Sequence, residues 1–260
     1  MQPAFPSQIM AIAGPAILKS SDPPDADERR KLERKMQRLM LTYWNDEVLP
    51  AVLREAQIQT ATRTVGAVFR DFGRKMNQIV LPVLERGVQN GVENAAAELE
   101  ELGIGIDFSL VNEGVLKWAR SHGSELVKGI TKTSRNQTRQ AISNWIASGD
   151  PLPVLEDKLA VTFGKKRAEL IASTEVTRVY AEGNMRAWQE SGVVEAKVWR
   201  TVRDERVCPI CEPFDNMVVG FKRKFTHPDD KIAKQIGKVM APPAHPRCRC
   251  WISPRVVGSA

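Results

Sequence analysis

The chain has 260 residues, of which 42% are hydrophobic and 27% are charged, and this ordinary globular composition excludes a protein that is disordered throughout. No segment approaches the roughly 20 uninterrupted apolar residues of a membrane-spanning helix, since the apolar run Met10–Leu18 is broken by Gly14 and Pro15. Lys19 follows this run, so the basic region of a signal peptide is missing and we expect synthesis in the cytosol with no membrane partner.

The net charge of +7 is unevenly distributed along the chain. Residues 165–260 carry 18 Lys and Arg against 11 Asp and Glu, whereas residues 1–164 carry 20 of each kind. A local excess of positive charge favours a polyanion such as nucleic acid, or an acidic protein surface. The alternative interpretation is a solvated basic surface that keeps the protein soluble.

Residues 1–27 contain five prolines and few periodic apolar positions, which predicts an extended N-terminal arm that becomes ordered only against a partner. From Glu28 to Leu53, apolar residues recur at intervals of three and four, the pattern of an amphipathic helix. Asp25 or Asp27 is expected to cap this helix, and Pro50 to bend or divide it.

A second helical pattern runs from Thr62 to Glu101, with Pro82 inside it and Gly103 and Gly105 at its end. Three short helices are expected next, over Leu110–Ser121, Gly123–Thr131 and Arg135–Ser148. Residues 28–164 are therefore predicted to form a helical domain.

A long helix is predicted over Lys165–Glu190, ended by Gly192. One face of it carries only small groups, which would let another element approach closely: Ala168, Ala172, Val176, Val179, Gly183 and Ala187. Beside that face, four charged residues are spaced for ion pairs within the helix: Glu175, Arg178, Glu182 and Arg186.

After Gly192 the period falls towards two, which predicts a strand over Ala196–Val202. The apolar runs Met217–Val219 and Trp251–Pro254 are candidates to pair with it. The predicted fold class is thus α+β: a largely helical N-terminal half, followed in residues 165–260 by a long helix packed on a small β-sheet with a cysteine-rich knuckle.

All four cysteines lie close to the C-terminus. Cys208 and Cys211 form a C-x-x-C pair, and Cys248 and Cys250 a C-x-C pair. Two such turns, brought together by a hairpin, supply the tetrahedron of thiolates that Zn²⁺ prefers. His245 and His227 are additional nitrogen ligands nearby, so the sequence predicts a zinc site.

Three other interpretations of the cysteines compete with zinc. A thioredoxin-like redox pair is disfavoured because the βαβ context of that motif is missing. Disulfides are disfavoured by a cytosolic site of synthesis, and unpaired buried thiols would not need this spacing. Four sulfur ligands would make the zinc structural, whereas a catalytic zinc would need an open position, His245 as a ligand, and Glu205, Glu212 or Asp215 as the base.

Basic residues cluster in the cysteine region and are candidates to contact the phosphates of DNA: Arg200, Arg203, Arg206, Lys222, Arg223, Lys224, Arg247 and Arg249. Such binding is expected to be independent of base sequence and to weaken steeply with salt, with a log–log slope near −0.9 per neutralised phosphate of duplex DNA.

Several C-terminal segments together resemble the hallmark of the phage head-morphogenesis domain, found in the Mu F-like minor head proteins. They are Glu169–Arg178 (ELIASTEVTR), Asn184, Gly192–Val193, Lys197–Trp199, Asp204–Cys211 (DERVCPIC) and Pro242–Cys250 (PPAHPRCRC). The resemblance spans about residues 165–255, whereas the helical first half carries no distinctive motif.

This resemblance implies a minor capsid protein of a tailed phage or prophage, associated with the portal vertex and acting in procapsid assembly and in the handling of packaged DNA. The implied partners are the portal protein, other capsid or scaffold proteins and double-stranded DNA. The implied location is the virion, in the capsid interior or at the portal vertex, after assembly in the cytoplasm of the bacterial host.

We expect no enzymatic activity. The sequence has no Walker loop, no Gly-x-Ser-x-Gly elbow, no His-Glu-x-x-His motif and no dinucleotide fingerprint. The alternatives to a head protein are a sequence-independent DNA-binding zinc module, or a nuclease or protease of the virion that depends on His245.

Overall fold

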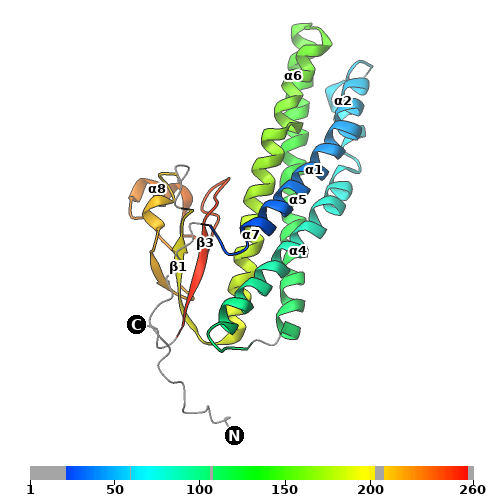
Figure 1. Ribbon diagram of the computed structural model, residues 1–260. Coiled ribbons are helices and arrows are strands. Elements are labelled where there is room, and N and C mark those ends of the chain that lie inside the picture. The colour runs from blue at the N-terminus through cyan, green and yellow to red at the C-terminus, as the bar shows by residue number, and fades with distance from the viewer. Residues whose placement is uncertain (1–21, 59, 106–107, 203–207, 257–260) are drawn as a thin grey trace.

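The computed structural model describes residues 22–58, 60–105, 108–202 and 208–256, so most of the predicted N-terminal arm lies outside the described residues. The helices form an elongated bundle, and a small sheet lies beside α7 with α8 on the side away from the bundle (Figure 1). The helices are α1 (Ala26–Tyr43), α2 (Leu49–Ala56), α3 (Ala61–Val68), α4 (Phe72–Glu100), α5 (Phe108–Ser148), α6 (Leu152–Phe163), α7 (Lys165–Ser191) and α8 (Asp230–Ile236). The predicted α+β class is confirmed.

The first predicted helix is divided just before Pro50, as expected. A π-helical turn, η1 (Trp44–Val48), joins α1 to α2, and the Leu49 N–H donates to the Trp44 carbonyl five residues back. A proline cannot donate a backbone hydrogen bond and its ring displaces the carbonyl four residues earlier, so a wider turn at this point accommodates Pro50. Asp25 occupies the N-cap position of α1, but its side chain makes no cap hydrogen bond, and its Oδ1 instead accepts from Arg29 Nε at 2.6 Å.

The second predicted helix is two helices, α3 and α4, with Pro82 inside α4 and the left-handed residue Gly103 after its end. The prediction of three short helices between Leu110 and Ser148 is wrong, because α5 is one continuous helix over this range. Gly123, at the boundary between two of the predicted helices, does not interrupt α5. It instead lets α4 approach closely, since a Cβ at this position would lie 3.2 Å from Leu84 Cδ1.

The small face of α7 is buried, and α4 approaches it closely, in agreement with the prediction that small side chains would let another element come near. Ala168, Ala172, Val176, Val179 and Ala187 are all at most 1% exposed. A Cβ on Gly183 would lie 2.8 Å from Gly91 Cα, so the two helices cross almost backbone to backbone at this glycine pair. α7 ends at Gly192, whose φ of 68° is left-handed and suits glycine.

The sheet consists of β1 (Val194–Arg200), β2 (Val218–Gly220) and β3 (Trp251–Val256), antiparallel in the order β2-β1-β3. Lys197 pairs with Val219 on one side and with Pro254 on the other, so β1 is the central strand. The three predicted strands are therefore present, with the first one shifted by two residues towards the N-terminus. In the described residues, no helix is both long and apolar enough to span a membrane.

Lys197 lies in the centre of this sheet and is completely buried. Its Nζ donates to the carbonyl oxygen of Phe221 at 2.8 Å and contacts Met240 Sδ at 2.9 Å. Burial lowers the pKa of this lysine to about 8, because the charged form loses its hydration. The side chain thereby attaches the long segment between β2 and β3 to the central strand.

We expect Glu98→Gln to stabilise the protein increasingly as the pH rises. Burial, and then the charge of Asp25, raise the pKa of Glu98 to about 8 from the ordinary value of 4.5. For an acid with a raised pKa in the folded state, stability is lost as the pH climbs from the unfolded to the folded value. The advantage of the variant should therefore grow by about 3 kcal/mol between pH 6 and pH 9.

Urea unfolding at the two pH values measures this difference. Glu100, two residues further along α4, is exposed and provides the matched control, since solvent screens its charge. The assignment of Glu98 as a buried and destabilising carboxylate would be contradicted by either of two results. The gain in unfolding free energy from Glu98→Gln could stay constant with pH, or it could equal the gain from Glu100→Gln.

Candidate metal centre

Two loops carry the predicted metal ligands. In the first, Cys208–Cys211 forms a tight turn, in which the N–H groups of Cys211 and Glu212 both donate to the Cys208 carbonyl, at 2.9 and 3.1 Å. In the second, Arg247 has a left-handed φ of 61° and the Cys248 N–H donates to the His245 carbonyl at 3.2 Å. These turns direct side chains from distant parts of the sequence towards one point.

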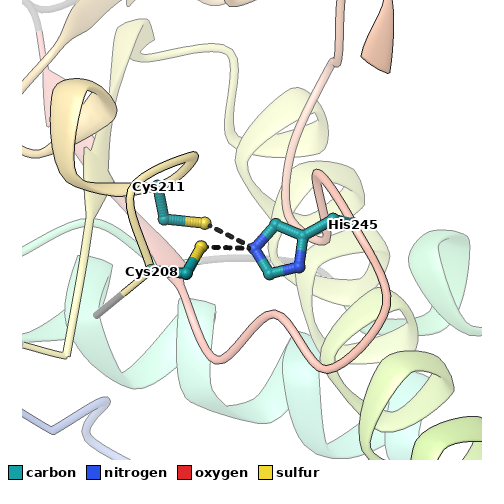
Figure 2. Close-up of side chains that lie close together, drawn as sticks. All are labelled: Cys208, Cys211 and His245. Carbon is teal, nitrogen blue, oxygen red and sulfur yellow. Dashed lines mark hydrogen bonds between the residues drawn. The ribbon is translucent and has the colours of Figure 1, made fainter. Parts of the chain in front are cut away.

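The structure gathers all five candidate ligands into two groups that share Cys211. Cys208, Cys211 and His245 form one group, and Cys211, Cys248 and Cys250 form the other, with the ligand atoms of each group within 4.8 Å of one another. His245 Nε2 lies 2.9 Å from Cys208 Sγ and 3.0 Å from Cys211 Sγ (Figure 2). The imidazole thus faces both sulfurs of the first turn.

The tautomer of His245 suits metal binding. Its Nδ1 lies 2.7 Å from the carbonyl oxygen of Pro246. Because a carbonyl oxygen can only accept, Nδ1 carries the proton and the lone pair of Nε2 points at the cysteines. A histidine that ligates a metal characteristically donates its other N–H in this way.

Two of the cysteine sulfurs, those of Cys211 and Cys248, are spaced as in a tetrahedral site. Cys211 Sγ and Cys248 Sγ are 3.7 Å apart, and sulfurs bound to one zinc at about 2.3 Å would lie about 3.8 Å apart. Hydrogen bonds from Cys211 and Cys250 lower the pKa of the Cys248 thiol, and the same sharing of protons with Cys248 raises the pKa of Cys211. Sulfurs this close compete for protons, and a dication removes that competition.

The second loop is fixed to α7 by two buried threonines. Thr177 Oγ1 donates to the Cys248 carbonyl at 2.9 Å, and Thr174 Oγ1 accepts from the Arg247 N–H at 2.9 Å. Both belong to the helical segment that carried the family resemblance. The geometry therefore explains why that segment accompanies the cysteine motifs, since it holds the loop that presents them.

We expect Thr177→Val to lower the free energy of unfolding by about 1–3 kcal/mol, because it leaves the buried Cys248 carbonyl without a donor while keeping the shape of the side chain. Thr177→Ser, which keeps the hydroxyl, is the control and should retain most of the stability. Chemical denaturation of both variants tests this, and a larger loss in Thr177→Ser than in Thr177→Val would show that the methyl group, and not the hydrogen bond, is what matters.

The other proposed ligands and bases lie elsewhere. His227 belongs to neither donor group, and its Nδ1 accepts from the Asp229 N–H at 3.0 Å. Asp215 Oδ1 accepts from the Thr201 N–H at 3.0 Å, so this carboxylate holds the end of β1. Glu212 begins the short 3₁₀ turn η2 (Glu212–Phe214), and Glu205 lies outside the described residues.

The structure does not collect the described basic candidates in one patch. Arg200 pairs with Trp251 at one end of β1 and donates to Ser253 Oγ at 3.1 Å, whereas Lys222, Arg223 and Lys224 are exposed beyond β2, near the other end of β1. Arg247 Nη2 donates to the Lys166 carbonyl at 3.1 Å, and Arg249 is exposed and lies near Glu33. Arg203 and Arg206 lie outside the described residues.

His122 is the partner of Glu175 that the sequence did not indicate. Glu175 pairs with Arg178 at 3.3 Å, as predicted, but its Oε2 also lies 2.6 Å from His122 Nε2 on α5. The His122 ring stacks on Trp118 with the ring centroids 4.8 Å apart. No local motif joins α5 to α7, so only the packing of the two helices reveals this contact.

Comparison with known proteins places the chain in a family. The model of the family described as phage Mu protein F like protein matches residues 78–253, from within α4 to within β3. The match therefore includes both cysteine turns and also extends through helices that carry no distinctive motif. No curated protein and no solved structure matches the chain significantly.

Proposed function

The chain belongs to the phage Mu protein F-like family, and from this premise we propose that it is a minor structural protein of a phage head whose C-terminal module is stabilised by one zinc ion. The family match over residues 78–253 is the observation that carries the proposal. It favours a location in the virion, in the capsid interior or at the portal vertex, after assembly in the cytoplasm of the host.

Four of the five gathered donors would hold the zinc. We assign three positions to Cys208, Cys211 and Cys248, of which Cys211 belongs to both donor groups, and the fourth to His245 or Cys250. When bound, the ion would supply a permanent crosslink between two loops that hydrogen bonds already connect. Thr174 and Thr177 would transmit this rigidity to α7 and hence to the bundle.

The donor set supports a structural role and not a catalytic one. Within the described residues, neither donor group includes a carboxylate that could act as a base beside a metal-bound water. A nuclease or protease of the virion would need such a group, and Asp215 already accepts a backbone N–H. We therefore propose that the protein is not an enzyme.

Exposed apolar side chains at the end of the bundle support a protein partner. Ile58 follows α2 and is 74% exposed, while Ile146 near the end of α5 is 51% exposed. Together with Trp145 they line a groove of about 660 Å³. Apolar groups gathered on a surface favour association with another protein, here the portal or another capsid or scaffold protein.

Assembly of heads tests the proposal. The chain would be produced together with the major capsid, scaffold and portal proteins of the same phage, and the particles purified by sedimentation. We expect the protein in particles that contain the portal, and in much smaller amounts in particles made without it. Equal amounts in both would contradict the portal location, and its absence from both would contradict a role in the head.

A further inference from the structure

The middle of α5 carries an unusual distribution of charge. Between Glu125 and Asp150 the helix has four basic residues, Lys128, Lys132, Arg135 and Arg139, and no Asp or Glu. The balance of charge over residues 1–164 therefore conceals a local excess. This stretch is separate from the cysteine region, where the basic candidates were predicted.

The four cations share one face of the helix. Their spacing of four, three and four residues places successive side chains about 5–6 Å apart at Cβ. All four are exposed. Lys128 pairs with Glu125 at 2.7 Å, whereas Lys132, Arg135 and Arg139 form no ion pair within the part of the chain that the structure describes. Three charges on this row are thus uncompensated.

A groove runs beside the row. It has a volume of about 510 Å³ and is lined by all four cations together with Asn136, Thr131 and Gly73 at the start of α4. A Cβ on Gly73 would lie 3.5 Å from Thr131 Oγ1, so the glycine keeps this side of the groove open. The lining therefore combines positive charge with hydroxyl and amide groups, the donors that bind phosphate oxygens.

We propose that this face of α5 binds the phosphate backbone of double-stranded DNA. The row from Lys128 to Arg139 is about 16 Å long, which corresponds to about five phosphates of one strand. Two of its members are arginines, whose planar guanidinium groups bind phosphate in a bidentate manner. A regular, rigid row of cations matches the even spacing of DNA phosphates. It matches the irregularly spaced carboxylates of a protein surface less well.

This inference goes beyond the proposed structural role: it gives the handling of packaged DNA, which the family resemblance implies, a surface on the helical bundle. It does not depend on the zinc site or on attachment to the portal. Contacts to the backbone alone would make the binding independent of base sequence. They would also leave the bases of the bound DNA without protein contacts.

The test is the salt dependence of binding to a 30-base-pair duplex of mixed sequence, measured by fluorescence anisotropy. The variant Lys132→Gln/Arg135→Gln/Arg139→Gln removes the three uncompensated charges, and glutamine preserves the helix. The matched control, Lys222→Gln/Arg223→Gln/Lys224→Gln, removes the same charge from the sheet module. Thermal unfolding and metal content establish that both variants fold.

We expect the α5 variant to reduce the magnitude of the log–log salt slope by about 2.7, and the control to reduce it by less than about 1. A slope smaller by about 2.7 means that, between 50 and 200 mM salt, the affinity of the α5 variant falls by a factor about 40 less than that of the native chain. Equal reductions in both variants, a larger reduction in the control, or no binding by the native chain would overturn the proposal. So would displacement of the DNA by polyglutamate at lower charge concentration than by unlabelled duplex, because it would identify an acidic protein as the ligand.

These outcomes are independent of the test of the proposed head function. A chain that binds DNA through α5 but is absent from purified heads would leave the DNA surface standing and remove the head role. A chain that enters heads but shows no α5-dependent binding would do the reverse.

Discussion

Replacing Cys211 with serine should abolish metal binding and destabilise the protein by more than about 4 kcal/mol, the range in which loss of a metal site lies. Cys211 is the residue common to both donor groups, so its loss leaves neither group with three ligands. Elemental analysis of the purified, reduced protein should give one equivalent of zinc per chain for the native sequence and none for Cys211→Ser. Thermal unfolding measures the loss of stability.

The size of this effect follows from the small apolar core around the site. Trp199, Phe214 and Phe225 pack together there, with ring centroids 4.8–6.4 Å apart, on a sheet in which β2 has only three residues. Small modules of this kind depend on a metal or disulfide in addition to their core. A chelator should therefore lower the stability of the native protein and leave that of Cys211→Ser unchanged.

Single substitutions then identify the fourth ligand. If His245 holds it, His245→Gln loses zinc while Cys250→Ser keeps most of it, and an all-cysteine site gives the opposite result. His227→Gln is the control, because His227 belongs to neither donor group and its loss should leave the zinc bound. Full retention of zinc by Cys211→Ser, or a native protein without metal in which all four thiols react, would contradict the zinc proposal.

The long helix α7 shows what sequence patterns predict well. Its ends, its small face and its internal ion pairs follow from periods of three and four and from Gly192, all of which are local features. The strands were predictable for the same reason, since alternation of apolar residues is local. The turns that present the cysteines follow from local sequence as well, because each is set by a few neighbouring residues.

Contacts between distant segments explain most of what the sequence did not reveal. Three short helices were predicted where α5 is continuous, because Gly123 has the same sequence appearance whether it ends a helix or allows a neighbour to approach. Burial of Lys197 breaks the expected alternation in β1, and only the position of Phe221 and Met240 explains it. The basic row on α5 was hidden by acidic residues elsewhere in the same half of the chain.

The glycine pair at the crossing of α4 and α7 predicts the second large effect. Gly183→Ala should lower the free energy of unfolding by about 3 kcal/mol or more, above the usual cost of overpacking. The added methyl group would meet the Val88 carbonyl and lie 2.8 Å from both Gly91 Cα and Val92 N. These are backbone atoms of a packed helix, so relief requires the whole of α4 to move away from α7.

Gly129→Ala is the matched control for this substitution. It introduces the same methyl group in an exposed part of α5, where a Cβ would find no atom within 4 Å. Because alanine favours a helix over glycine by about 1 kcal/mol, the control should be neutral or stabilising. Urea unfolding compares the two variants, and their difference isolates the steric cost of the crossing. Equal stabilities would mean that α4 and α7 are held together without close contact at Gly91 and Gly183, and that neither glycine is needed for the bundle that supports the cysteine module.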